Sequence, residues 1–530
     1  MNGGFAVSVL FIKLGENMKG IIINQDTDGI LKGIGRADAP YCTALDIENF
    51  VKEFEGTQIT DYFICVFSTL TNYPSKVCTS TLDKYHVKEE QGVPVDYSAV
   101  STIKGSHHTF EVLGVDPHQI MIDGFKKIGI NPWLSFRMND FHYRECEISG
   151  CFSEFYYKHP EVQRIKFHPE FIQSNADKAY DYYYDIVRDH MKSVIDEALD
   201  RYDVCGIELD FQREIHLFGM GRDHLGIEIM NGFIREVDEI IHKYEEKYAH
   251  EIKLAVHIAP DVQTNFDFGL DVVKWAREGL IDMIIPAGRF SSADNNMPIR
   301  QWKSLLEPYG TLVAAGLDWR LAPYQYEQTI SPTIETFAAF AANAYEQGAD
   351  KIYFYNYFRS RIWEHMDREA EFVTDPNMSP FALPVYWTVI NKLGDPETIM
   401  DLNRHHIITY SDTVQFWVHG GMNRQLPVTF PGTRGRGFKI GVGKLPENAK
   451  LTVRFGLEDG EQALADIPRV FANSELCEYV GNLVDEKLTK YRLFCYDIPA
   501  AAFDTVIYPY IIAQQDTTVH YVDLLVKIEK

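Results

Sequence analysis

Residues 202–213 read Tyr202-Asp-Val-Cys-Gly-Ile-Glu-Leu-Asp-Phe-Gln-Arg213, an apolar run whose end carries charged side chains. The run is typical of a buried strand, and side chains two apart on a strand project from the same face, so Glu208 and Asp210 are predicted to share one site. Burial and mutual repulsion raise the pKa of one carboxyl group in such a pair. A carboxylic acid that keeps its proton near neutral pH can act as a general acid, so the stretch indicates a hydrolytic centre. The structural alternative is that one carboxylate caps the next helix or pairs with Arg213.

The same kind of run recurs along the chain in a regular order. Strands are predicted at residues 20–24, 62–67, 132–137, 204–211, 253–259, 283–287, 311–316 and 351–357, with helices at 117–128, 176–201, 226–249, 270–279, 297–306 and 332–347. Gly129, Gly279 and Gly348 stand where helix C-caps are expected. Eight units of strand and helix predict an α/β protein with a (β/α)8 TIM barrel. A doubly wound sheet would need a glycine-rich phosphate loop after its first strand, and residues 24–29 do not form one.

Other segments set the predicted domain limits. Long loops after the second and third strands, at about 68–115 and 138–175, are expected to build the mouth of the barrel. Short alternating runs with Pro and Gly turns fill residues 406–530 and predict an all-β sandwich, jelly-roll-like. We therefore expect an N-terminal extension at 1–18, a barrel at 19–395 and a β-sandwich at 402–530.

Composition limits the partners and the compartment. The chain of 530 residues is 45% hydrophobic and 24% charged, as in globular proteins, and its formal charge of −25 argues against nucleic acid and anionic lipid as partners. The eight cysteines show no metal-type spacing, which favours free thiols and a cytoplasmic location. The N-terminal apolar run is too short to span a membrane and lacks the features of a signal peptide. Self-association into a homo-oligomer is left open.

Polar residues at the ends of barrel strands are the candidates for function, because active sites form at that end of the barrel. Hydroxyl-rich ligands such as sugars suit so many hydrogen-bonding groups. The candidates, strand by strand, are Asn24 and Asp26; Arg137, Asn139, Asp140 and His142; Glu208 and Asp210; His257 and Asp261; Asp318 and Trp319; and Tyr355, Asn356 and Arg359.

Three of these residues also have a structural interpretation. Arg137 could neutralise Glu208 on the neighbouring strand. A lone histidine on an apolar strand is often a core residue with satisfied hydrogen bonds, which applies to His257. Trp319 either stacks on a sugar ring or covers the end of the barrel.

The segments Arg137-Met-Asn-Asp140 and Gly206-Ile-Glu-Leu-Asp-Phe-Gln-Arg213 resemble those of the glycoside-hydrolase-like family 10 group, bacterial TIM-barrel proteins with an appended β-domain. The resemblance covers about residues 19–395. It implies the barrel fold and glycosidase chemistry but names no substrate.

The fourth strand is also similar to the chitinase signature Asp-Gly-x-Asp-x-Asp-x-Glu. Gln212 stands where the chitinase acid would be, which puts chitin hydrolysis in doubt. In the clan of retaining barrel glycosidases, a strand-4 Glu is the acid/base and a strand-7 carboxylate the nucleophile. Glu208 and Asp318 match that layout, although Asp318 is an aspartate where a glutamate is usual.

These observations predict a glycoside hydrolase that acts on a carbohydrate with no cofactor and no metal. Glu208 is the expected general acid, with Asp318 or Asp210 as its partner. A metal-dependent hydrolase is one alternative, but His107-His108 is the wrong spacing for a metal clamp and lies in a loop. A non-catalytic carbohydrate-binding barrel is the other.

Overall fold

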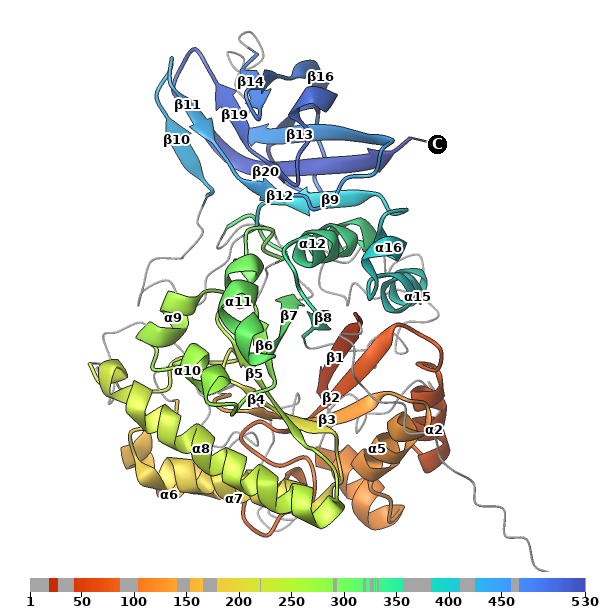
Figure 1. Ribbon diagram of the computed structural model, residues 1–530, viewed down its shortest axis with the longest axis vertical. Coiled ribbons are helices and arrows are strands. Elements are labelled where there is room, and N and C mark those ends of the chain that lie inside the picture. Colours follow the sequence, from red (N-terminus) through yellow and green to blue (C-terminus); the bar gives the residue numbers. More distant parts are fainter. Residues whose placement is uncertain are drawn as a thin grey trace, which may run out of the picture.

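The structure is a computed structural model (Figure 1). It describes residues 19–26, 42–85, 103–140, 153–164, 179–219, 221–288, 293–317, 321–324, 328, 330, 333–355, 383–409, 425–458 and 467–529. No helix in these ranges is both long enough and apolar enough to cross a membrane. The six described cysteines are free thiols.

Eight parallel strands close into a barrel, which confirms the predicted fold. The strands are β1 (Ile21–Asp26), β2 (Ile59–Phe67), β3 (Asn131–Arg137), β4 (Gly206–Asp210), β5 (Lys253–Ile258), β6 (Met283–Pro286), β7 (Leu312–Leu317) and β8 (Lys351–Phe354). Each strand pairs with the next one in sequence, and β8 pairs with β1. Every predicted strand overlaps an observed one.

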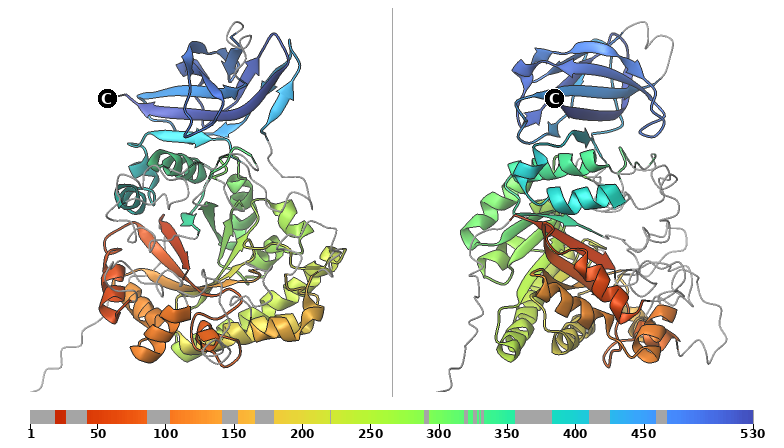
Figure 2. Two further views of the ribbon diagram at one scale, coloured as in Figure 1. Left: turned by 180° about the vertical axis from the view of Figure 1, so that it is seen from behind. Right: turned by 90° about the vertical axis from the view of Figure 1, so that its right-hand side faces the viewer.

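Helices surround this barrel (Figures 1 and 2). They are α2 (Ala44–Lys52), α5 (Pro117–Lys127), α6 (Glu154–Lys158), α7 (Asp185–Arg201), α8 (Asp223–Tyr248), α9 (Val262–Asp267), α10 (Val272–Arg277), α11 (Ile299–Leu306), α12 (Ile334–Glu346), α15 (Leu383–Lys392) and α16 (Pro396–Ile399), with short turns η1 (His108–Val112), η2 (Pro160–Val162) and η4 (Glu307–Tyr309). Gly129, Gly279 and Gly348 have φ values of 81°, 73° and 100°, as the C-cap prediction requires.

One helix prediction is wrong at its start. The pattern predicted a helix over 176–201, but the described helix α7 begins at Asp185. The backbone N–H groups of residues 180–182 donate instead to the side chain of Asn139 and to the carbonyls of Val162 and Leu217. These long-range bonds tie the segment to neighbouring loops, so it cannot make helical bonds.

The C-terminal region is built from antiparallel strands. They are β9 (Arg404–Ile407), β10 (Val428–Phe430), β11 (Gly435–Gly437), β12 (Ile440–Gly441), β13 (Ala449–Leu457), β14 (Arg469–Ala472), β15 (Glu475–Leu476), β16 (Glu478–Leu483), β17 (Arg492–Ile498), β18 (Val506–Ile507), β19 (Pro509–Ile512) and β20 (Thr517–Ile528), with a turn η6 (Ala500–Ala502). One sheet has the order β10-β20-β13-β17-β16 with β9 beside β20, and another has the order β11-β19-β14-β15. A separate apolar core contains side chains from both sheets.

The β domain packs against the barrel beside α12 (Figure 1). Ile407, Leu493 and Tyr521 of the β domain belong to the apolar cluster of the barrel. The side chain of Asn295 donates to the carbonyl of Ile407 and faces Nδ1 of His406 at 3.2 Å. The apolar contacts and hydrogen bonds together fix this interface.

Strands β3 and β4 pack closely inside the barrel at Gly206. A Cβ atom on Gly206 would overlap the indole ring of Trp133, which is buried, stacked on Phe63 at 4.8 Å and bonded through Nε1 to Asp61 at 3.0 Å. Because this ring has no room to move, we expect Gly206→Ala to lower the free energy of unfolding by about 1–3 kcal/mol, measured by urea denaturation.

The matched control is Gly232→Ala in α8, where the added methyl group meets no atom within 4 Å apart from the neighbouring backbone of the helix itself. Alanine in a helix interior is favoured over glycine, so this variant should gain about 0.5–1 kcal/mol. Equal effects of the two substitutions would contradict the packing argument.

Candidate active site

The barrel interior near the carboxyl ends of the strands is lined by polar side chains in two layers. The register of the sheet places Ser135 and Glu208 side by side on β3 and β4. One layer further toward the mouth, Arg137, Asp210 and His257 lie side by side on β3, β4 and β5. The strand alternation read from the sequence therefore places both carboxylates inside the barrel.

Glu208 is fully buried and is held by uncharged donors. The hydroxyl of Tyr353 donates to Oε1 at 2.7 Å, and Nδ2 of Asn24 donates to Oε2 at 2.9 Å. The same Asn24 amide also donates to Ser135 at 3.2 Å. Among the described side chains, none forms an ion pair with Glu208.

Asp210 is also fully buried, but its partners differ. Its Oδ1 lies 2.8 Å from Nδ1 of His257 and accepts the backbone N–H of Arg213 at 3.0 Å. Its Oδ2 accepts the hydroxyl of Tyr355 at 2.9 Å. The carboxylate is thus surrounded by groups that favour its charged form.

These surroundings move the two pKa values apart. Burial, and then the charge of Asp210, raise the pKa of Glu208 to about 7. Burial alone would raise the pKa of Asp210 as well, but His257, Arg137 and the Tyr355 hydroxyl outweigh it and lower this pKa below its usual range. The pair can therefore hold one acid and one carboxylate at neutral pH.

Arg137 forms ion pairs with two other carboxylates of the mouth. Its Nη2 lies 2.5 Å from Asp26 and its Nη1 lies 2.6 Å from Asp140, while its guanidinium lies 6.0 Å from the centroid of the Tyr355 ring. Asp140 is also 3.5 Å from Nε of Arg213. The structural alternative for Arg137, an ion pair with Glu208, is not what the geometry shows.

The side chains of two further candidates form hydrogen bonds that hold loops and a helix end in place. The side chain of Asn139 forms hydrogen bonds with the backbone N–H and carbonyl of Tyr180 and donates to the carbonyl of His216. It therefore joins two loops. Asp261 caps α9 by accepting the N–H and hydroxyl of Thr264. Substrate contact by either residue stays a prediction. The remaining candidates lie outside the described residues: His142, Asp318, Trp319, Asn356 and Arg359.

The sequence analysis missed two residues that touch this site. Tyr353 and Ser135 each lie two positions before a predicted candidate, Tyr355 and Arg137, and so face the same side of their strands. The alternation rule contains this signal. Both residues resemble ordinary strand residues by type, which is why the pattern alone did not single them out.

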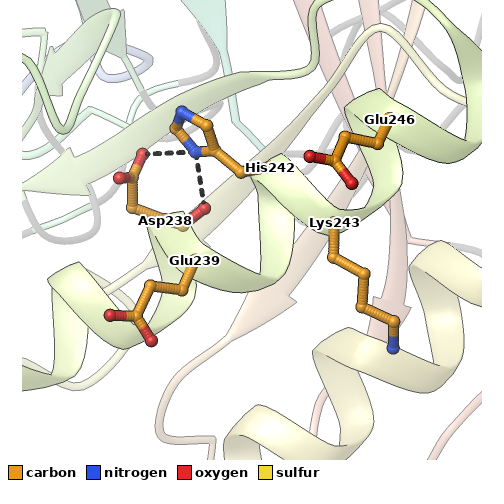
Figure 3. A pocket seen from close by; sticks show the side chains of 5 residues that line it. All are labelled: Asp238, Glu239, His242, Lys243 and Glu246. Atoms are coloured by element: carbon orange, nitrogen blue, oxygen red, sulfur yellow. Dashed lines mark hydrogen bonds and ion pairs between the residues drawn. The ribbon is translucent and has the colours of Figure 1, made fainter.

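A separate hollow lies on the outer surface of α8 and is lined by Asp238, Glu239, His242, Lys243 and Glu246 (Figure 3). Nδ1 of His242 contacts the carbonyl of Asp238 one turn earlier at 2.9 Å. All five residues belong to one helix, and four of them are exposed. The hollow is a feature of a solvated helix and is not connected to the paired carboxylates of β4.

Comparisons with known proteins give no family for this chain. No family model matches it, and a search of curated proteins finds no match. Membership of the glycoside-hydrolase-like family 10 group therefore stays a prediction.

Three similar solved structures are a cycloisomaltooligosaccharide glucanotransferase from a Paenibacillus species, α-L-fucosidase isoenzyme 1 from Paenibacillus thiaminolyticus and a chitinase from Paenibacillus sp. str. FPU-7. Their sequence identities are 6%, 9% and 9%, with TM-scores of 0.34, 0.34 and 0.38. The alignments cover 96%, 94% and 94% of this chain but 57%, 97% and 52% of those chains, so this chain spans little more than half of the first and third. Similarities of this size bear on neither substrate nor mechanism.

Proposed function

We propose that this protein is a glycoside hydrolase with Glu208 as its general acid. The observation that supports it most is the split of one buried carboxyl pair on β4, with a raised pKa at Glu208 and a lowered pKa at Asp210. Glycosidic cleavage needs such a pair, since one group donates a proton and the other stabilises positive charge. The resemblance of residues 137–140 and 206–213 to the family 10 group agrees with this chemistry.

Glu208 and Asp210 have different roles in the proposed reaction. Glu208 gives its proton to the glycosidic oxygen while the bond to the anomeric carbon breaks and the aglycone leaves as an alcohol. Water then adds to the anomeric carbon and returns a proton to the Glu208 carboxylate. The charge of Asp210 stabilises the positive charge that develops on the sugar ring, and His257 and Tyr355 hold that carboxylate in place. The role of Asp318 as nucleophile stays a prediction.

The direct test is a panel of 4-nitrophenyl glycosides in both anomeric forms, followed by release of nitrophenolate. We expect the wild-type protein to cleave at least one member of the panel. Absence of cleavage across glycosides of the common neutral sugars would contradict the proposal.

A non-catalytic carbohydrate-binding barrel is the second candidate. It is favoured by the complete burial of both carboxylates. Binding of a sugar without cleavage of any of its aryl glycosides would favour this candidate over the hydrolase.

The pH dependence of the proposed reaction follows from the pair. Activity needs Glu208 protonated, so it should fall as pH rises through about 7, and it needs Asp210 ionised, so it should fall again in acid. The Tyr353 hydroxyl favours the charged form of Glu208, so Tyr353→Phe should move the alkaline limb of the kcat/KM profile to higher pH. An unmoved limb would assign that limb to another group.

We also expect the activity to survive exhaustive chelation, because a proton donor opposite a second carboxylate needs no metal ion. Turnover would be measured after EDTA dialysis, with a zinc-dependent peptidase as positive control. Loss of turnover that a divalent ion restores would favour a metal-dependent hydrolase instead.

A further inference from the structure

The tautomer of His257 is fixed by its contact with Asp210. The lowered pKa of Asp210 keeps this group ionised, and a carboxylate only accepts hydrogen bonds. Nδ1 of His257, 2.8 Å from Oδ1, therefore carries the proton. In the neutral ring the second nitrogen, Nε2, is then a hydrogen-bond acceptor.

Nε2 of His257 is buried, and nothing in the described ranges donates to it. The imidazole is 2% exposed and contacts two aromatic rings, with centroid distances of 5.2 Å to Tyr353 and 4.9 Å to Tyr355. Buried acceptors in native proteins are nearly always paired, with water or a ligand where protein groups do not serve. An acceptor left open beside the carboxylate pair therefore points to a ligand donor.

Two buried amide oxygens also lack a donor, those of Asn24 on β1 and of Gln212, two residues after Asp210. Asn24 uses its Nδ2 for Glu208 and Ser135, and Gln212 uses its Nε2 for the carbonyl of Ala287 at 2.8 Å. Their oxygens, Oδ1 and Oε1, are buried and receive no donor from the described part of the chain. In both residues the amide nitrogen is hydrogen-bonded and the amide oxygen is not.

We propose that the ligand of this site is a neutral polyol that donates hydroxyl hydrogen bonds to Nε2 of His257 and to the side-chain oxygens of Asn24 and Gln212. This inference rests on the proposed function for the identification of the polyol as a sugar. Hydroxyl groups supply the donors that all three atoms lack. We expect a uronic acid to bind more weakly, because its carboxylate donates no hydrogen bond and would meet the charge of Asp210.

The test uses the wild-type protein with 15N-labelled histidine and unreactive free monosaccharides. The probes are glucose, galactose, mannose, fucose and N-acetylglucosamine, with glucuronic and galacturonic acid as anionic counterparts. The Nε2 signal of His257 is assigned by its loss in His257→Gln. We expect an unprotonated Nε2 in the free protein, and a shift of this signal with at least one neutral sugar but with neither uronic acid.

Affinity in a His257→Phe variant tests the acceptor itself. The phenyl ring keeps the approximate shape of the side chain but has no acceptor nitrogen, and Asp210 keeps the backbone N–H of Arg213 and the hydroxyl of Tyr355 as donors. We expect the best-binding neutral sugar to bind about tenfold more weakly by calorimetry, the loss of roughly one hydrogen bond. His242→Phe, on the exposed face of α8, is the matched control and should not change the affinity.

The outcomes separate this inference from the proposed function. A protonated Nε2 in the free protein, tighter binding of a uronic acid, or a sugar that binds without moving the Nε2 signal would each overturn the inference, even if aryl glycosides are cleaved. Absence of a shift with every monosaccharide would overturn it too. If a neutral sugar shifts the Nε2 signal but no glycoside is cleaved, the inference about the ligand is supported and the proposed hydrolase activity is contradicted.

Discussion

Glu208→Gln is expected to lower kcat by about 10²–10⁴-fold on substrates whose leaving group needs a proton, because it removes the general acid. The loss should be much smaller on a 2,4-dinitrophenyl glycoside, whose leaving group departs without a proton. Both rates would be measured on the anomer that the wild-type protein cleaves. A loss of equal size on both substrates would assign Glu208 to another role.

The fold should tolerate this change. Tyr353 can still donate to the amide oxygen of the new glutamine, and the open Oδ1 of Asn24 can accept from its amide nitrogen after a flip of the Asn24 side chain. Glu239→Gln on the exposed face of α8 is the chemically matched control and should leave kcat unchanged. An unfolded Glu208→Gln protein would mean that this residue is structural.

The stability of this variant depends on pH in a defined direction. The folded protein holds the pKa of Glu208 near 7, above the value of about 4.3 expected for an unfolded chain. Wild-type stability therefore declines as pH rises between these values, because the unfolded chain releases the proton first. The variant lacks this term, so its thermal midpoint should exceed that of the wild type increasingly from pH 5 to pH 7.

The sequence was sufficient for the barrel and for the carboxylate pair, because both follow from local alternation. An apolar strand faces inward at every second residue, and this rule alone puts Glu208 and Asp210 in one interior. The partners of Arg137 could not be predicted in this way. They lie on β1 and in the loop after β3, and only the closure of the barrel brings Asp26 to Arg137.

Hydrogen bonds between loops could not be predicted from the sequence for the same reason. Asn139 is predicted to contact sugar because it follows a strand end, and this contact stays a prediction. Its place in the sequence did not indicate that its amide also joins the backbones of two segments that are distant in sequence. Spacing along one strand carries no information about such bonds. The helix expected from residue 176 failed for the same reason, since the donors of residues 180–182 are used by other loops.

A buried ion pair at the opposite, amino-terminal end of the barrel provides the second large effect. Asp61 at the start of β2 pairs with Lys351 at the start of β8, and it also accepts from Trp133 at 3.0 Å and Asn131 at 3.1 Å. We expect Lys351→Met to lower the free energy of unfolding by about 3–5 kcal/mol, because it leaves a buried carboxylate without its cation. Denaturant unfolding at pH 7 measures the loss.

Lys158→Met is the control, because its pair with Glu154 is exposed and should contribute about 0–1 kcal/mol.

The contribution of the Asp61–Lys351 pair depends on pH. Burial alone would raise the pKa of Asp61, but Lys351 and the other donors lower this pKa. The pair therefore stabilises the fold above the unfolded pKa of aspartate, and this stabilisation is lost in acid. Without Lys351, burial raises the pKa of Asp61 above its usual value, so the difference between Lys351→Met and wild type should begin to shrink before the pH has fallen to the unfolded value of about 4 and should go on shrinking below it. Adding Asp61→Asn to Lys351→Met should recover part of the loss, since no charge is then left buried. If Lys351→Met alone is no less stable than Lys158→Met, the buried ion pair does not stabilise the amino-terminal end of the barrel.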